Sequence, residues 1–194
     1  MENTIIYLIG HYGVGKLTVG KQIAAQTGAR LFDNHLANNV IFSLIREDGR
    51  TKIPDRAWDL IMTIRRQALT AMAEIAPPAA SFVLTNALME GDPMDRQAYD
   101  EVVATAARRG SIFVPVFLSA SDGAHAERIP SPDREARLKM TNVDGAANVR
   151  KTRPLLDVIH PHRIDLETTS VPAEEVARRI VAHAQQMGKS EAIS

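Results

Sequence analysis

Three glycines and a lysine form the strongest chemical pattern in the sequence, Gly10-x-x-Gly13-x-Gly15-Lys16-x-Thr18. A polyphosphate site needs several backbone N–H groups that point into one hollow, and glycine permits the positive φ angles and the close approach that such a loop requires. The pattern follows an apolar run and precedes a helical pattern, so the helix N-terminus adds its own N–H groups and dipole. The spacing predicts a phosphate-binding loop with the Lys16 ammonium beside the terminal phosphates.

One position departs from the usual form of such a loop. A serine or threonine normally follows the lysine and binds Mg²⁺ through its hydroxyl group. Here the position holds Leu17, and Thr18 lies about 100° further around the helix.

The loop and the order of the predicted elements resemble those of the P-loop kinases of small molecules and nucleoside monophosphates, the shikimate-kinase-like and adenylate-kinase-like group. The run of residues 13–19 is also similar to a branch of shikimate-kinase-like proteins and AAA-type ATPases. Adenylate kinases likewise carry a residue without a hydroxyl group after the lysine, followed by threonine. The resemblance implies ATP and Mg²⁺ as cofactors, with the nucleotide bound by Gly10, Gly13, Val14, Gly15, Lys16, Leu17 and Thr18.

The metal and the acceptor hydroxyl have candidates just after the second predicted strand, in Phe32-Asp33-Asn34-His35. Shikimate-kinase-like enzymes end this strand with two acids, the first in the magnesium shell and the second facing the substrate hydroxyl. The resemblance implies the first role for Asp33, with Thr18 as a second candidate near the metal, and His35 replaces the second acid. A histidine near its ordinary pKa can orient or deprotonate a hydroxyl group. The alternative is that Asp33 and Asn34 cap the next helix.

Further acceptor contacts are predicted on the third strand and on a long helix. Thr85 and Asn86 end a buried strand at its carboxyl edge, where ligands bind open α/β sheets. In the related kinases an arginine from the long helix binds an anionic group of the acceptor, which implies this role for Arg65 or Arg66. The alternative for such a pair is a solvated helix surface.

A charged segment over about 121–153 occupies the place of the kinase lid. Lid arginines stabilise the negative charge that spreads over the transferred phosphoryl group, and the resemblance assigns this to Arg128 and Arg134, with Arg137 behind them. The alternative is intrahelical ion pairing, such as Asp133 with Arg137. Near the last strand, the resemblance places Thr168 and Thr169 beside the adenine.

The elements that must position these residues alternate between strand and helix patterns. Strands are predicted at residues 5–9, 30–33, 81–85, 112–118 and 163–166, with Pro115 weakening the fourth or placing a bulge in it. Helices are predicted from 16 to the Gly28 stop, over 35–47, 54–76 and 92–110, and over 172–186. The helix over 54–76 carries an apolar stripe, namely Trp58, Ile61, Ala68, Met72 and Ile75. This order predicts a single domain, residues 1–194, built as a three-layer α/β/α sandwich around a mostly parallel five-stranded sheet.

Composition excludes several other classes of protein. The 194 residues contain no cysteine, which rules out disulfides and cysteine-ligated metal sites. The 23 basic and 23 acidic residues give zero net charge, so no general nucleic-acid or membrane-surface binding is expected. The N-terminal apolar run lacks a basic leader and is too short for a signal peptide. We therefore expect a cytoplasmic protein, monomeric or homodimeric.

The resulting prediction is a kinase that transfers the γ-phosphoryl group of ATP to a small hydroxylated or anionic acceptor. Leu17 and the missing second acid leave two alternatives. One is a nucleotide-binding regulatory or partner-docking module with weak hydrolysis, and the other is a nucleoside monophosphate kinase.

Overall fold

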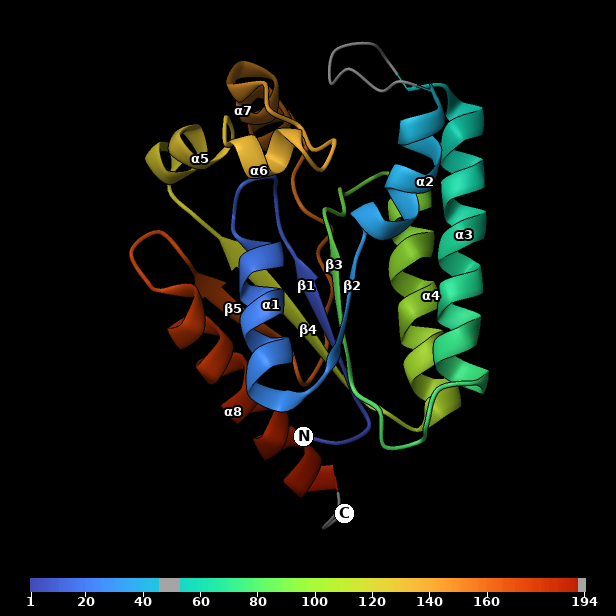
Figure 1. The fold of residues 1–194 in the computed structure, drawn as a ribbon. Helices are drawn as coiled ribbons and strands as arrows, with labels where there is room; N and C mark the ends of the chain where they lie inside the picture. Colours follow the sequence, from blue (N-terminus) through green and yellow to red (C-terminus); the bar gives the residue numbers. More distant parts are fainter. Residues whose placement is uncertain (46–52, 192–194) are drawn as a thin grey trace.

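The computed structural model describes residues 1–45 and 53–191 and contains a five-stranded sheet between layers of helices (Figure 1). The strands are β1 (Thr4–Ile9), β2 (Arg30–Asp33), β3 (Phe82–Asn86), β4 (Ile112–Ser119) and β5 (Ile164–Glu167). They lie in the order β2-β3-β1-β4-β5, and every neighbouring pair is parallel. This confirms the predicted fold class, and the strand bounds differ from the predicted ones by about one residue.

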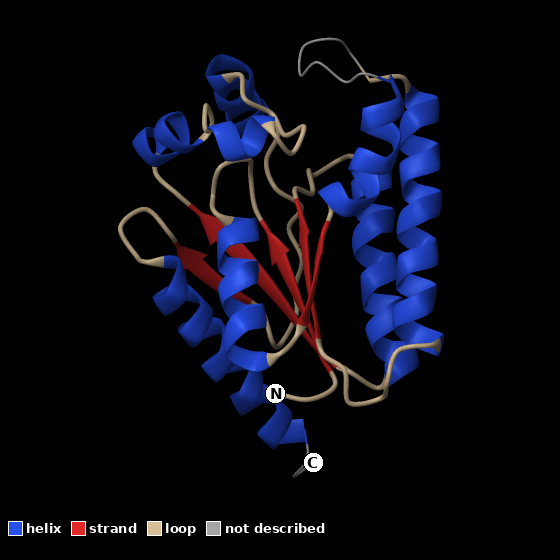
Figure 2. Cartoon of the chain, in the orientation of Figure 1, coloured by secondary structure: helices blue, strands red, loops and turns tan. Residues whose placement is uncertain are grey.

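The helices cover both faces of the sheet, as the alternation of strands and helices predicts (Figure 2). Their bounds are α1 (Lys16–Thr27), α2 (His35–Ile45), α3 (Asp55–Glu74), α4 (Pro93–Arg109), α5 (Asp122–Arg128), α6 (Pro132–Glu135), α7 (Val143–Thr152) and α8 (Ala173–Glu191). Helices α1 and α8 pack on one face and α3 and α4 on the other, while α5, α6 and α7 lie above the carboxyl ends of the strands (Figure 1). The last two residues of the helix predicted over 35–47 lie outside the described residues.

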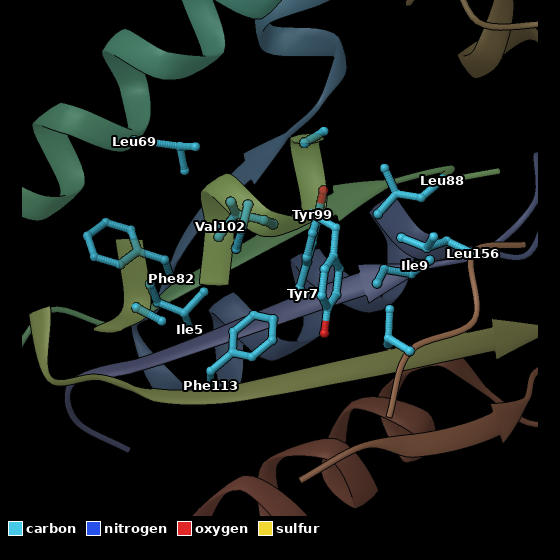
Figure 3. Packing of buried hydrophobic residues seen from close by; sticks show 14 of the residues in the cluster. Ile5, Tyr7, Ile9, Leu69, Phe82, Leu88, Tyr99, Val102, Phe113 and Leu156 are labelled. Atoms are coloured by element: carbon cyan, nitrogen blue, oxygen red, sulfur yellow. The ribbon is translucent and has the colours of Figure 1, made fainter. Parts of the chain in front are cut away.

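Alternation along the central strand β1 builds two cores. Ile5, Tyr7 and Ile9 face the layer of α3 and α4, and Ile6 and Leu8 face the layer of α1 and α8. All five side chains are fully buried. In the first core the rings of Tyr7 and Tyr99 stack with centroids 6.2 Å apart (Figure 3). Because β1 is buried on both faces, the loop that follows it has a rigid base.

Local signals end the elements where the sequence predicts. Gly28 and Gly110 close α1 and α4 in the left-handed conformation, and the Asp92 side chain accepts hydrogen bonds from the N–H groups of Met94 and Asp95. Pro115 lies inside β4 without interrupting it, one residue before the pairing with β5 begins at Val116.

The stripe predicted on α3 is wrong at one end. Ile61 and Met72 are buried, but Ile75 is 80% exposed because the helix ends at Glu74 and Ile75 is its C-terminal cap. Leu69 and Met62 are buried on this helix instead.

Among the described residues no helix is both long enough and apolar enough to cross a membrane.

Candidate functional site

A cavity of about 450 Å³ lies at the carboxyl edge of the sheet, between the loop after β1, the end of β2 and the segment from α5 to residue 139. Nine residues predicted for the site line it: Gly13, Gly15, Lys16, Leu17, Thr18, Asp33, His35, Arg128 and Arg134. The structure therefore brings together most of the predicted residues from three separate stretches of chain. Gly10, Val14, Arg65, Asn86 and Thr168 are not among the lining residues.

The loop after β1 owes its shape to its glycines. A Cβ atom on Gly10 would lie 2.5 Å from the carbonyl oxygen of Leu118 and 2.8 Å from Val14 Cγ2, so a side chain has no room there. Gly13 and Gly15 have φ angles of 83° and 92°, which L-residues rarely adopt. Gly15 also caps α1 without a side chain, so no side chain of its own competes for the N–H groups of the first helical turn.

The Lys16 ammonium turns back onto this loop. Its Nζ donates hydrogen bonds to the carbonyl oxygens of Gly10 at 2.6 Å and His11 at 2.8 Å. Burial, and then the charges of Lys139 and Arg134, lower the pKa of Lys16 to about 7. An anion that enters the cavity would therefore stabilise the charged form of Lys16.

Asp33 is tied to two partners at the end of β2. Its Oδ1 accepts a hydrogen bond from the Thr85 hydroxyl at 2.5 Å, and its Oδ2 forms an ion pair with Lys139 Nζ at 2.8 Å. Burial alone would raise the pKa of Asp33, but the Lys139 charge and the hydrogen bonds bring that pKa below its ordinary value. The carboxylate is thus ionised and points to Lys139 and Thr85 rather than capping α2.

His35 begins α2 and faces the same cavity. Its Nδ1 lies 3.2 Å from Asn39 Oδ1, and its ring meets the Phe42 ring edge-on. Burial, followed by the Lys139 charge, lowers the pKa of His35 to about 4. The imidazole is therefore neutral at pH 7 and is available as a hydrogen-bond partner for a hydroxyl group.

Asn86 and Arg65 meet below the cavity. The Tyr7 hydroxyl accepts a hydrogen bond from Asn86 Nδ2 at 3.1 Å and a long one from Arg65 at 3.4 Å. Asn86 Oδ1 also accepts a hydrogen bond from the Ala87 N–H. Arg66 lies on the outer surface in an ion pair with Glu101 at 2.7 Å. Asn86 is therefore held in an internal network, and Arg66 matches the solvated alternative.

The arginines predicted for the lid differ in how they are held. Arg128 donates to the Thr168 hydroxyl and to the carbonyl oxygens of Thr168 and Thr169, at 2.9–3.2 Å. Arg134 donates twice to the carbonyl oxygen of Met140, at 3.0 and 2.8 Å. Arg137 forms the predicted ion pair with Asp133 at 3.0 Å, but the pair is not intrahelical, because α6 ends at Glu135 and Arg137 lies in the turn that follows.

Thr168 connects the end of β5 to the phosphate loop. Its hydroxyl is placed to donate to the carbonyl oxygens of Val14 at 2.9 Å and Ser119 at 3.0 Å, and the residue is 4% exposed. Thr169 accepts a hydrogen bond from the Ser121 N–H at 2.7 Å. Thr168 therefore fastens the loop from behind, and the adenine contact predicted for it stays a prediction.

Sequence reasoning missed Lys139, Tyr12 and Lys21, which also line the cavity. Lys139 lies within the charged segment over about 121–153, and nothing in its local sequence separates it from a solvated lysine. Its partner Asp33 is 106 positions away. Tyr12 lies within the phosphate loop and Lys21 lies three residues after it, so their proximity to Lys16 in the sequence was the available signal.

The lining suits a magnesium ion that is held mainly by phosphate and water. Residues 1–45 and 53–191 contain no group of three or more His, Asp or Glu side chains able to hold a metal. Asp33 supplies one carboxylate beside the phosphate loop, and the Thr18 hydroxyl also lines the cavity. Since Mg²⁺ usually takes one or two carboxylates and the phosphates of its substrate, this donor set fits the ion only together with a nucleotide.

Comparison with solved structures identifies proteins of similar fold. A gluconokinase from Sinorhizobium meliloti 1021 matches with a TM-score of 0.66 and 17% identity, over 98% of this chain and 97% of that one. A sugar kinase from Janibacter sp. HTCC2649 matches with a TM-score of 0.61 and 13% identity, over 94% and 95% of the two chains. The tunicamycin resistance protein of Deinococcus radiodurans matches with a TM-score of 0.51 and 16% identity, over 93% and 94%.

No protein-family model matches the sequence, and no curated protein matches it either. At these identities the likeness concerns the fold. Together with the phosphate loop after β1, it leads to one conclusion: the chain has the fold of the P-loop small-molecule kinases.

Proposed function

We propose that this protein is an ATP-dependent kinase that phosphorylates a small hydroxylated acceptor bearing an anionic group. The observation that carries the proposal is the convergence of Lys16, Arg134 and Lys139 on a cavity bounded by the phosphate loop and Asp33. Such a concentration of positive charge over backbone N–H groups suits a polyphosphate.

On the donor side, the loop from Gly10 to Thr18 binds the phosphates and the Lys16 ammonium stabilises the charge that shifts during transfer. Arg128, oriented by the carbonyl oxygens of residues 168 and 169, lies against the nucleotide. Arg134 approaches from the lid and stabilises the equatorial oxygens. A bound Mg²⁺ would neutralise phosphate charge, with Asp33 as its protein carboxylate.

On the acceptor side, Asp33 and the neutral His35 orient the hydroxyl group that receives the phosphoryl group. Arg65 binds the anionic group of the acceptor, and Asn86 positions the strand end through Tyr7. Catalysis then rests on positioning and electrostatics, as is general for phosphoryl transfer.

The charge of the cavity supports an anionic acceptor. Its lining contains the cations Lys16, Lys21, Arg128, Arg134 and Lys139 against the anions Asp33 and Asp133, while His35 is neutral. When Lys16 is protonated, the lining thus holds three positive charges in excess. Magnesium-bound ATP carries about two negative charges, so an additional anionic group is accommodated. A gluconokinase is among the proteins of similar fold, which supports including sugar acids among the acceptors to be tested.

The test is ADP release by the purified protein with ATP and Mg²⁺, in the presence of a panel of acceptors. The panel contains sugar acids, neutral sugars, nucleosides, nucleoside monophosphates and hydroxylated antibiotics. We expect one acidic acceptor to accelerate ADP release by at least about 10³ over hydrolysis. Lys16→Ala removes the acceleration, and Lys189→Ala, at an exposed lysine of α8, leaves it unchanged.

Two other outcomes lead elsewhere. Reversible transfer onto a nucleoside monophosphate identifies a nucleotide kinase. Tight ATP binding, with no acceptor that accelerates ADP release, favours the regulatory module. The ion pair between Asp33 and Lys139 also suits such a module, because a paired carboxylate is not available for catalysis.

A further inference from the structure

Within residues 1–45 and 53–191, the ion pair between Lys139 and Asp33 is the one polar contact that joins the predicted lid segment directly to the predicted catalytic carboxylate. Lys139 lies in the turn after α6, and Asp33 ends β2. Their side chains are only 10% exposed each, and Nζ lies 2.8 Å from Oδ2. Removing one partner of such a buried ion pair leaves an unpaired buried charge, which lowers the stability of the fold.

The turn that carries Lys139 is built as one unit. The Lys139 N–H donates to the Arg134 carbonyl oxygen at 2.9 Å, and the Arg134 guanidinium donates twice to the Met140 carbonyl oxygen. Asn39 Nδ2 on α2 donates to the Arg137 carbonyl oxygen at 3.1 Å. A displacement of this turn therefore moves Lys139 and Arg134 together.

The cavity holds too many cations for the acids that face it. Lys16, Arg134 and Lys139 surround Asp33, and each of the two others lowers the pKa of Lys16. The second lining acid, Asp133, is exposed at the rim and is paired with Arg137. A polyphosphate in this cavity would attract Lys139 away from Asp33, because it offers more negative charge at the same distance.

The same carboxylate oxygen is the natural ligand for a phosphate-bound divalent cation. An ammonium at 2.8 Å and a dication beside the same oxygen repel each other strongly in a cavity of low dielectric constant. Asp33 therefore serves one of the two cations at a time.

We propose that Lys139 is a catalytic residue that exchanges between Asp33 and the nucleotide phosphates. In the nucleotide-free protein it neutralises Asp33. When magnesium-bound ATP enters, Lys139 leaves the carboxylate, contacts the phosphates and brings Arg134 onto them. This inference rests on the proposed function, since it requires a nucleotide in the cavity.

The experiment measures ATP binding by calorimetry, with excess Mg²⁺ and with a chelator instead. The quantity compared is the magnesium enhancement, the Kd without metal divided by the Kd with metal. In Lys139→Gln, metal-free ATP binds about tenfold more weakly because one charged contact is lost, and the enhancement rises about tenfold because Asp33 is released to the metal. Lys139→Arg keeps an enhancement close to that of the wild type.

A double variant makes the result specific to this pair. In Asp33→Asn, the further change Lys139→Gln is expected to leave the enhancement unchanged. This variant also removes both charges together, so it avoids the unpaired buried charge that could prevent folding of a single variant. Lys189→Gln is the matched control.

Fluorescence provides a second readout of binding. Trp58 is the single tryptophan, and its ring meets Phe42 edge-on at 5.7 Å, while Phe42 meets His35 at 6.3 Å.

An enhancement that stays within about twofold of the wild type in Lys139→Gln overturns the exchange and leaves the kinase proposal standing. A wild-type protein that binds no nucleotide overturns both.

Discussion

The proposed donor and acceptor sides of the site are built in different ways. On the donor side the main chain forms the site, through Gly10, Gly13 and Gly15, and the side chains behind it serve to hold the loop, as Thr168 does for Val14. On the acceptor side the polar side chains are engaged with one another, Asn86 and Arg65 through the Tyr7 hydroxyl. A site formed by the backbone can be predicted from glycine spacing. A site formed by side chains is harder to predict, because its composition depends on which side chains the fold leaves free to contact a ligand.

The largest expected effect tests the donor side through Lys16. Lys16→Met should lower acceptor-dependent ATP turnover by about 10³, because the ammonium stabilises charge that develops only in the transition state. The folded protein should lose little stability, since Lys16 is surrounded by other cations. Steady-state kinetics and thermal unfolding measure the two effects, and a turnover within tenfold of the wild type would remove Lys16 from the mechanism.

A pair of glycine variants separates packing from backbone conformation in the loop. Gly10→Ala should lower the free energy of unfolding by about 3 kcal/mol, because its Cβ atom meets the backbone of β4 at 2.5 Å. Gly15→Ala has nothing within 4 Å of the added atom and should cost about 1 kcal/mol for its positive φ alone. Urea unfolding compares them, and equal losses would contradict the close packing of Gly10.

Adjacent arginines on α3 sharpen the acceptor side. Arg65→Met should raise the KM for the acceptor about tenfold and leave kcat nearly unchanged, because it removes one contact made equally in the ground and transition states. Arg66→Met is the matched control, since Arg66 pairs with Glu101 on the outer surface. If both variants keep the wild-type KM, the acceptor binds without Arg65.

The smallest expected effect is a pH dependence of stability that comes from Lys16. Its pKa is about 7 in the folded protein and near 10.5 in the unfolded chain, so between these values the unfolded chain holds more protons and stability rises with pH. From pH 7 to pH 8 the wild type should gain about 1 kcal/mol relative to Lys16→Met. Urea unfolding of both proteins across this range provides the measurement, and parallel curves would mean that Lys16 keeps its ordinary pKa.

Local signals predicted most of the fold and the donor side. The buried strand pattern of residues 5–9, the Asp92 cap and the Gly28 and Gly110 stops all act within a few residues, so they are visible in sequence. The exposed Ile75 shows the limit of the same reasoning. The apolar stripe predicted on α3 includes Ile75, but the helix ends one residue earlier, at Glu74.

The part of the site that sequence did not predict depends on contacts between distant residues. Lys139 meets Asp33 only because the lid turn folds over β2, and the network of Tyr7, Asn86 and Arg65 joins β1, β3 and α3. No spacing rule connects such positions. Their roles follow from tertiary structure, as do the low pKa of His35 and that of Lys16.

The central place of β1 in the sheet has a consequence for biosynthesis. Its hydrogen-bonding neighbours are β3, which begins at Phe82, and β4, which begins at Ile112, and the loop behind it is fastened by Thr168. A ribosome adds about 5–20 residues per second, so the most apolar segment of the chain waits several seconds without partners. We therefore expect chaperones to assist folding of the growing chain, and a circular permutant that begins at β3 should depend on them less.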